Sequence, residues 1–228
     1  MIQKPMFSPQ TEWVPPDSFP DLSKYDEIAI DLETKDPELK TLGSGSITGK
    51  GEIVGIAIAV EGWSGYYPIA HEGGGNLDKK KVMDWFKTIL NYDSVKIFHN
   101  AMYDVCFIRA AGLKINGLIV DTMIAGSLVD ENRFRYDLGS MGRDYLGKGK
   151  NEALLAETAN VWGIDAKSEM YKLPAMYVGE YAERDAELTL DLWQEMRKEI
   201  NHQDIESIFK LETELFPCLV DMRFLGVR

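Results

Sequence analysis

Three short patterns of acidic and polar residues occur in one order along the chain and supply four carboxylates, an amide and a phenol. In chain order they are Asp31-Leu-Glu33, Asn100-x3-Asp104 and Tyr181-x3-Asp185. Mg²⁺ and Mn²⁺ prefer hard oxygen ligands, several of them carboxylates. Two such ions about 3.5–4 Å apart can activate a water molecule and stabilise the oxygen that leaves a phosphodiester. The set therefore predicts a site for two divalent cations at which water cleaves a phosphodiester.

The first pair lies in a segment with the pattern of a strand. Residues 27–34 alternate in apolar character, and side chains at i and i+2 of a strand face the same side. Asp31 and Glu33 should therefore project together from a buried strand. Two like charges placed this way are costly unless a cation lies between them. The alternative is a strand end that emerges into solvent, since the Asp-x-Glu spacing also occurs elsewhere in the chain.

The other two pairs have helical spacing. Side chains at i and i+4 share one face of a helix, and apolar residues continue the faces of both pairs. Asn100 and Asp104 should therefore point inward, as should Tyr181 and Asp185. The alternatives are a helix start capped by Asn100 with a solvated Asp104, and a charged surface helix around Asp185.

Composition and charge are those of an ordinary globular chain of 228 residues, 45% hydrophobic, with a net charge of −12. This charge has the wrong sign for a scaffold that binds DNA phosphates directly, but it suits a protein that binds cations first. No apolar run approaches the ~18 residues of a membrane span, and the amino terminus lacks the pattern of a signal peptide. Cys106 and Cys218 are the only cysteines, which favours a reduced intracellular compartment over a disulfide framework or zinc site.

Strand and helix patterns alternate over the first half of the chain, which predicts an α/β domain with a mixed β-sheet flanked by helices. Strands are predicted over 27–34, 53–60, 65–70, 95–99 and 117–121. Helices are predicted over 77–92 and 101–111, with mostly helical structure after 122. The Gly-rich segment 35–52 is predicted to be a loop, and its glycines lack the spacing of a phosphate-binding loop.

The ordered triple resembles the DEDD exonucleases, in the subclass whose third motif carries a tyrosine. It is similar in detail to the 3′→5′ proofreading domain of family A DNA polymerases, the bacterial polymerase I type and its phage relatives. "FHNAMYDVCFI" resembles the second motif of that family, "YAERDAELTLDLW" the third, and residues 120–147 the segment between them. The tail "LFPCLVDMRFLGV" looks like the entry into a polymerase domain. The resemblance covers residues 24–228 and implies a ribonuclease H-like fold.

The resemblance also implies domain boundaries and an activity. Residues 24–204 would be the exonuclease domain, and 205–228 the helical start of a polymerase domain that follows this chain. The proline-rich residues before them, 1–23, are predicted to be an extended arm. The implied activity is metal-dependent release of nucleoside monophosphates from a single-stranded or frayed 3′ end of DNA, as proofreading, in the cytoplasm of a bacterium or phage-infected cell. The alternatives are an RNase D-like 3′→5′ exoribonuclease and a non-catalytic scaffold domain. The complete set of acids disfavours the scaffold domain.

Carried over residue by residue, the resemblance assigns metal and water roles to five residues. Asp31, Glu33 and Asp185 would hold the Mg²⁺ or Mn²⁺ ion that carries the attacking water. Asp31 would bridge to the second ion, which Asp104 would reach through water. Tyr181 would orient the attacking water.

Two further residues would bind the substrate. Asn100 would help to position the terminal nucleotide, and Thr34 would contact the substrate terminus through its backbone. His99, at a strand end, is predicted to be structural. Asp121 is predicted to cap the helix that follows it.

Overall fold

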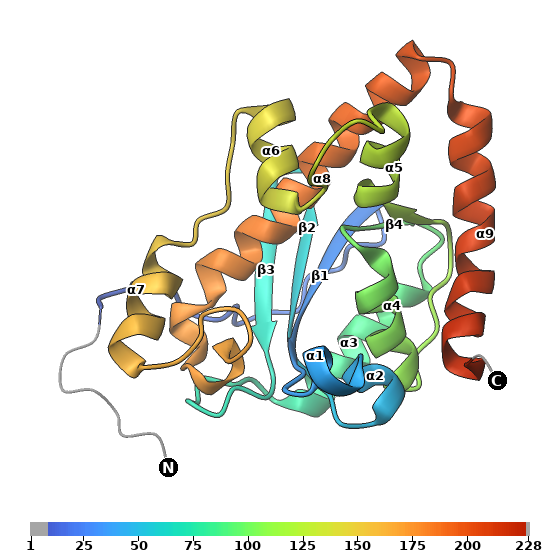
Figure 1. The fold of residues 1–228 in the computed structure, drawn as a ribbon. Helices are drawn as coiled ribbons and strands as arrows, with labels where there is room; N and C mark the ends of the chain where they lie inside the picture. Colours follow the sequence, from blue (N-terminus) through green and yellow to red (C-terminus); the bar gives the residue numbers. More distant parts are fainter. Residues whose placement is uncertain (1–8, 227–228) are drawn as a thin grey trace.

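The structure, a computed structural model, describes residues 9–226 and contains a five-stranded sheet with helices on both faces (Figure 1). The strands are β1 (Glu27–Lys35), β2 (Glu52–Val60), β3 (Trp63–Pro68), β4 (Val95–Phe98) and β5 (Ile119–Asp121). Their order across the sheet is β3-β2-β1-β4-β5. β1 pairs antiparallel with β2 and parallel with β4, and β4 pairs parallel with β5. The predicted mixed sheet is confirmed.

The helices of the described residues alternate with the strands and then dominate the second half. They are α1 (Leu39–Leu42), α2 (Gly45–Thr48), α3 (Lys79–Asn91), α4 (Ala101–Ala110), α5 (Thr122–Val129), α6 (Leu138–Leu146), α7 (Ala153–Trp162), α8 (Gly179–His202) and α9 (Glu206–Leu225). Two short 3₁₀ turns, η1 (Met170–Lys172) and η2 (Ala175–Tyr177), precede α8. Across residues 9–226, none of the helices combines the length and apolar character that a bilayer span requires.

The segment 35–52 departs from the prediction, because it contains the single-turn helices α1 and α2. The Asp36 carboxylate accepts a hydrogen bond from Gly45 N at 3.0 Å, and Gly51 N donates to Gly45 O at 3.1 Å. These contacts hold the segment in turns, and the Gly-rich composition gives no local signal of them.

Alternation along β1 divides its side chains between two layers. Ile28 and Ile30 belong to an apolar cluster that includes residues of α3 and α4. Ala29 belongs to a second cluster that includes residues of α5, α6 and α8. Asp31 and Glu33 have the same parity as Ala29, so they face α8.

Helix α8 lies across this face of the sheet (Figure 1) and contacts both β1 and β2. The strand residues beneath it are small and fully buried: Ala29, Ala57 and Ala59. Small side chains let a helix approach a sheet closely, because little volume separates the two backbones. This close packing brings the amino-terminal turns of α8 near the acidic end of β1.

The segment before β1 has no helix or strand over residues 9–23, and it packs against the domain. Trp85 Nε1 donates to Pro20 O at 2.9 Å, and Tyr67 OH donates to Ser18 O at 2.9 Å. Residues 1–8 of the predicted arm lie outside the described residues. The described part of the arm therefore packs against β3 and α3.

Helix α9 carries apolar residues on two faces. Phe209, Phe216 and Val220 pack onto the domain. On the other face, apolar side chains recur at helical spacing and are exposed: Ile208 (38%), Leu211 (57%), Leu215 (41%), Met222 (55%) and Leu225 (84%). A helix that is apolar on both sides is typical of one that is covered on both sides. We call these five exposed residues the α9 stripe.

Lys96 in β4 is fully buried, and its Nζ donates to the carbonyl oxygens of Tyr92 (2.6 Å), Ser94 (2.9 Å) and Asn116 (2.9 Å). We expect Lys96→Met to lower the free energy of unfolding by about 2–4 kcal/mol, because three carbonyls lose their donor. Urea unfolding measures this loss. The exposed Lys114→Met is the control, and equal stability of both variants would contradict the structural role of Lys96.

Candidate active site

Three elements bring the four predicted carboxylates into one cluster, in which Asp31 is half-buried and the other three are buried. Asp31 and Glu33 lie on β1, Asp104 on the first turn of α4, and Asp185 on the second turn of α8. Glu33, Asp104 and Asp185 are only 9%, 5% and 2% exposed. The alternatives of a solvent-exposed strand end, a solvated Asp104 and a charged surface helix around Asp185 are therefore wrong.

Burial and mutual repulsion raise the pKa values of this cluster. Burial raises the pKa of Asp31 to about 7, and the Asp185 carboxylate adds to the rise. Burial, followed by the charges of Asp31 and Asp185, holds the pKa of Glu33 well above its ordinary value. Burial and the charge of Asp31 do the same to the pKa of Asp104. The carboxylates are thus close enough to oppose one another's ionisation, and a cation among them would relieve the repulsion.

Asp104 is tied to the strand that carries the first motif. Its Oδ1 accepts a hydrogen bond from Leu32 N at 3.0 Å, so one carboxylate oxygen is committed to β1. The pairing of β1 with β2 changes register between Glu33 and Thr34. Such irregularities re-aim side chains and occur beside active sites. Thr34 Oγ1 lies 2.7 Å from Tyr103 OH, within hydrogen-bonding distance.

Asp121 holds the start of two helices. Its side chain accepts from Met123 N at 2.8 Å, which confirms the predicted cap of α5. It also accepts from Asn100 N (2.9 Å) and Ala101 N (2.8 Å) at the start of α4. Asn100 has a left-handed φ of 63° and makes no side-chain cap, so the alternative of an Asn100-capped helix is wrong. The Asn100 side chain is exposed, so the prediction that it points inward with Asp104 is wrong, because Asn100 precedes the helix in a left-handed conformation.

The first turn of α8 is held by the arm and by β3. Trp13 Nε1 donates to Glu183 Oε1 at 3.0 Å, and Tyr66 N donates to the same oxygen at 3.0 Å. The Trp13 ring lies against Gly179, where a Cβ would come within 2.0 Å of it. Only glycine therefore permits this contact, which fixes the helix turns that carry Asp185.

Lys150 lies inside the cluster, although no sequence pattern singles it out. It comes from the loop between α6 and α7, and its Nζ forms an ion pair with Asp185 Oδ2 and a hydrogen bond with Tyr181 OH at 3.2 Å. Burial alone would lower the pKa of Lys150, but the carboxylates of Asp185, Asp31 and Glu33 raise it above its ordinary value. Lys150 is 31 and 35 residues from Tyr181 and Asp185, so only the fold brings them together.

A cavity of about 990 Å³ opens in front of the cluster. Asp31, Asp104 and Asn100 line it, together with His99. His99 Nδ1 lies 2.8 Å from Thr122 Oγ1, while its buried Nε2 has no hydrogen-bond partner. Although the chain has a net negative charge, the lining also includes four basic residues: Arg135, Arg143, Lys150 and Lys167. Asp31 and Asp104 of the cluster thus share one lining with these basic side chains and with Asp137 and Glu152, a mixture that suits an anionic substrate that meets cations.

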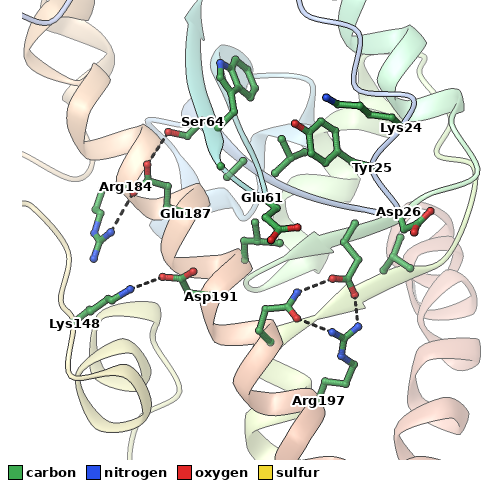
Figure 2. A pocket seen from close by; sticks show the side chains of 18 residues that line it. Lys24, Tyr25, Asp26, Glu61, Ser64, Lys148, Arg184, Glu187, Asp191 and Arg197 are labelled. Carbon is green, nitrogen blue, oxygen red and sulfur yellow. Dashed lines mark hydrogen bonds and ion pairs between the residues drawn. The ribbon is translucent and has the colours of Figure 1, made fainter.

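A second cavity, of about 1140 Å³, lies at the amino-terminal end of β1 (Figure 2). Its charged residues are largely paired with one another: Arg197 with Glu27 (2.7 Å), Arg184 with Glu187 (3.1 Å) and Lys148 with Asp191 (2.9 Å). None of the predicted site residues lines it. Because its charges already neutralise one another, the smaller cavity beside the carboxylates is the candidate active site.

Divalent cations fit the cluster by the chemistry of its donors. All four acids offer oxygen ligands, and Asp185 Oδ1 is buried with no hydrogen-bond partner. Among residues 9–226, no three acidic, histidine or cysteine side chains are arranged to ligate one ion. The Lys150 ammonium holds the other oxygen of Asp185 and supplies the positive charge in this arrangement.

The chain matches known proteins over nearly its whole length. Residues 10–201 match the model of a family described as 3′-5′ exonuclease. A DNA-directed DNA polymerase of Pseudomonas phage M6 is 36% identical over 240 residues, which cover 100% of this chain and 35% of that protein. The chain thus spans about a third of the length of this relative.

Solved structures share the fold. Brucella melitensis NrnC with bound Mg²⁺ has a TM-score of 0.63 at 16% identity, over 90% of this chain and 89% of that one. Escherichia coli RNase D, an exoribonuclease involved in structured RNA processing, has a TM-score of 0.57 at 15% identity, over 90% of this chain and 47% of that one. The mixed sheet and its helices are those of the ribonuclease H-like DEDD exonucleases.

The metal-free protein should lose stability as the pH rises through the titration of Asp31. Its pKa is about 7 in the folded protein, above the ordinary value of 3.8. Between those values the folded protein binds more protons than the unfolded chain, so the free energy of unfolding falls as the pH rises. Asp31→Asn lacks this titration. Above pH 7, in EDTA, it should be more stable than the wild type by about 1–3 kcal/mol.

Urea unfolding in EDTA from about pH 4.5 to about pH 8 measures this difference. The exposed Glu61→Gln is the control, because it changes an acid outside the cluster. A stability difference between Asp31→Asn and the wild type that does not change with pH would contradict the raised pKa.

Proposed function

Because the chain belongs to the 3′-5′ exonuclease family and is related to the exonuclease domains of family A DNA polymerases, we propose that it proofreads DNA. It would hydrolyse the last phosphodiester of a single-stranded or frayed 3′ end and release nucleoside monophosphates. The observation that carries this proposal is the cluster of Asp31, Glu33, Asp104 and Asp185 beside Tyr181, with Asp31 and Asp104 lining the adjoining cavity.

In this proposal, Mg²⁺ or Mn²⁺ ions bind at the cluster. Asp31, Glu33 and Asp185 would hold one ion, and Asp31 with Asp104 would hold a second. Such ions lower the pKa of bound water and offset the charge that develops on the departing oxygen. The hydrogen bond from Leu32 N leaves Asp104 with one free oxygen, which agrees with a weaker contribution from this residue.

Tyr181 would orient the attacking water and not deprotonate it. Burial, followed by the charge of Asp185, holds the pKa of Tyr181 far above its ordinary value. The phenol therefore keeps its proton at neutral pH, and its oxygen can donate and accept hydrogen bonds. This role would place the chain in the tyrosine-containing subclass of the DEDD exonucleases.

The cavity would hold the end of the nucleic acid strand. Arg135 and Arg143 line it and would face the phosphates, while Asn100 and the backbone of Thr34 would contact the terminal nucleotide. Phe134, fully exposed beside this wall, offers a flat surface on which a base can stack. These contacts would let a protein of net negative charge bind a polyanion locally.

An RNase D-like exoribonuclease is the second candidate, because the fold matches RNase D. That likeness holds at 15% identity, whereas the phage polymerase is 36% identical across the whole chain. DNA is therefore the favoured substrate. In either case the protein would act in the cytoplasm of a bacterial or phage-infected cell.

The activity test uses 5′-labelled single-stranded DNA and RNA of one sequence, with Mg²⁺, Mn²⁺ or EDTA. We expect a metal-dependent ladder that shortens from the 3′ end of DNA, and a loss on the order of 10²–10⁴-fold in Asp185→Asn. Asp191→Asn, on the same helix but outside the cluster, is the matched control.

Each other outcome of this test has a clear meaning. Faster degradation of RNA would favour the exoribonuclease. A ladder that survives in Asp185→Asn would place the chemistry elsewhere. A folded wild type that degrades neither substrate with either metal would favour a non-catalytic scaffold.

We also propose that a polymerase domain covers the α9 stripe. The phage relative is a polymerase of which this chain matches 35%, so the relative contains a large part that this chain does not match. An exposed apolar face of this kind is typical of a protein-interaction surface. A polymerase domain that follows the chain, as the tail resemblance implies, would bury it.

We expect Leu211→Glu/Leu215→Glu to weaken binding of the separately produced polymerase part of the phage M6 relative by at least ~10-fold, because it places two charges in the interface. Sedimentation velocity measures the complex. Lys210→Glu, on the same helix with an exposed side chain, is the control. Self-association of the wild type that the double variant abolishes would assign the stripe to a second copy instead.

A further inference from the structure

Lys150 separates the cavity from Asp185. Its side chain lines the cavity, whereas Asp185 is 2% exposed and is not part of the lining. The ammonium binds Asp185 Oδ2, and Asp185 Oδ1 has no partner. A cation that enters from the cavity and binds both oxygens of Asp185 must therefore displace the ammonium, and one that binds Oδ1 alone lies close to it.

The loop of residues 147–152 presents Lys150 to the cluster. Gly147 has a φ of 64°, a conformation that glycine adopts readily, and it ends α6. Lys148 lies on the other side, where it forms an exposed ion pair with Asp191 at 2.9 Å, and such pairs contribute little to stability. Two lysines separated by one glycine thus have different partners: Lys148 pairs on the surface of α8, and Lys150 pairs inside the cluster.

The charges around Lys150 explain why it is held there. Asp185, Asp31 and Glu33 all act on its ammonium. Buried like charges of this number are costly unless a cation compensates them. In the described part of the chain, Lys150 is the only lysine or arginine in ion-pair contact with any of the four clustered carboxylates.

We propose that Lys150 is a resident counter-cation that holds Asp185 while no metal is bound and yields this carboxylate to a divalent ion. Lys150 is thus a positioning residue. It stabilises the metal-free site and lowers its affinity for metal, because the ion must either displace an ammonium or bind beside one. This inference rests on the proposed metal-dependent function, and it adds a residue that sets how readily the site loads.

The test compares Lys150→Met with Lys148→Met in the full chain. Melting temperature in EDTA measures the metal-free site, and electron paramagnetic resonance of free Mn²⁺ measures affinity. We expect Lys150→Met to melt a few degrees lower in EDTA. We also expect it to bind Mn²⁺ roughly 3–10-fold more tightly, since a positive charge has left the site. Lys148→Met should change Mn²⁺ affinity less than ~2-fold.

Lys150→Arg keeps the charge and should bind Mn²⁺ within ~2-fold of the wild type. If Lys150→Met is unfolded in EDTA, recovery of the fold by Mn²⁺ alone supports the proposal, because the ion then replaces the ammonium. The proposal is overturned if Mn²⁺ does not restore the fold of Lys150→Met. It is also overturned if a folded Lys150→Met binds Mn²⁺ no more tightly than the wild type.

The two proposals fail in different ways. Equal Mn²⁺ binding by the wild type and Lys150→Met overturns the role of Lys150 and leaves the metal-dependent function intact. Absence of Mn²⁺ binding by both overturns the metal-dependent function and this inference together. Mn²⁺ binding by Lys150→Met but not by the wild type supports the inference, because the ammonium then prevents binding.

Discussion

The repulsion among four carboxylates in one buried space is the constraint on which the rest of the site depends. Asp31, Glu33, Asp104 and Asp185 come from a central strand and two packed helices, so none can move away without disturbing the core. The fold compensates in part through backbone donors and the Lys150 ammonium. The remaining cost makes the site receptive to cations.

Local periodicity predicted the features that depend on neighbours in the chain. Alternation over 27–34 placed Asp31 and Glu33 on one face of a strand, and that strand is central in the sheet. The spacing of four residues placed Asp104 and Asp185 on inward faces of helices, and both are buried. These predictions succeeded because strand and helix geometry fix which side chains share a face.

Contacts between distant segments could not be predicted in this way. Asp121 reaches across 21 residues to Asn100 N, so a distant residue sets the start of α4, and the helical spacing that predicted an inward Asn100 does not extend to it. Lys150 joins the cluster from a loop, and Arg135 and Arg143 add basic side chains to the cavity lining although the chain is acidic. No periodic pattern marks these residues, because their positions depend on how α6 and the loop after it pack on α8.

The contact between Trp13 and Gly179 gives the amino-terminal arm an influence on the site that its irregular structure does not suggest. Trp13 also binds Glu183, one turn along α8 from Gly179 and two residues before Asp185. An affinity tag or fluorophore attached to the arm can therefore change the site, since displacement of Trp13 would disturb the helix that carries Asp185. Conversely, the indole is a built-in spectroscopic reporter, because undocking of the arm would expose it to water and shift its emission to longer wavelength.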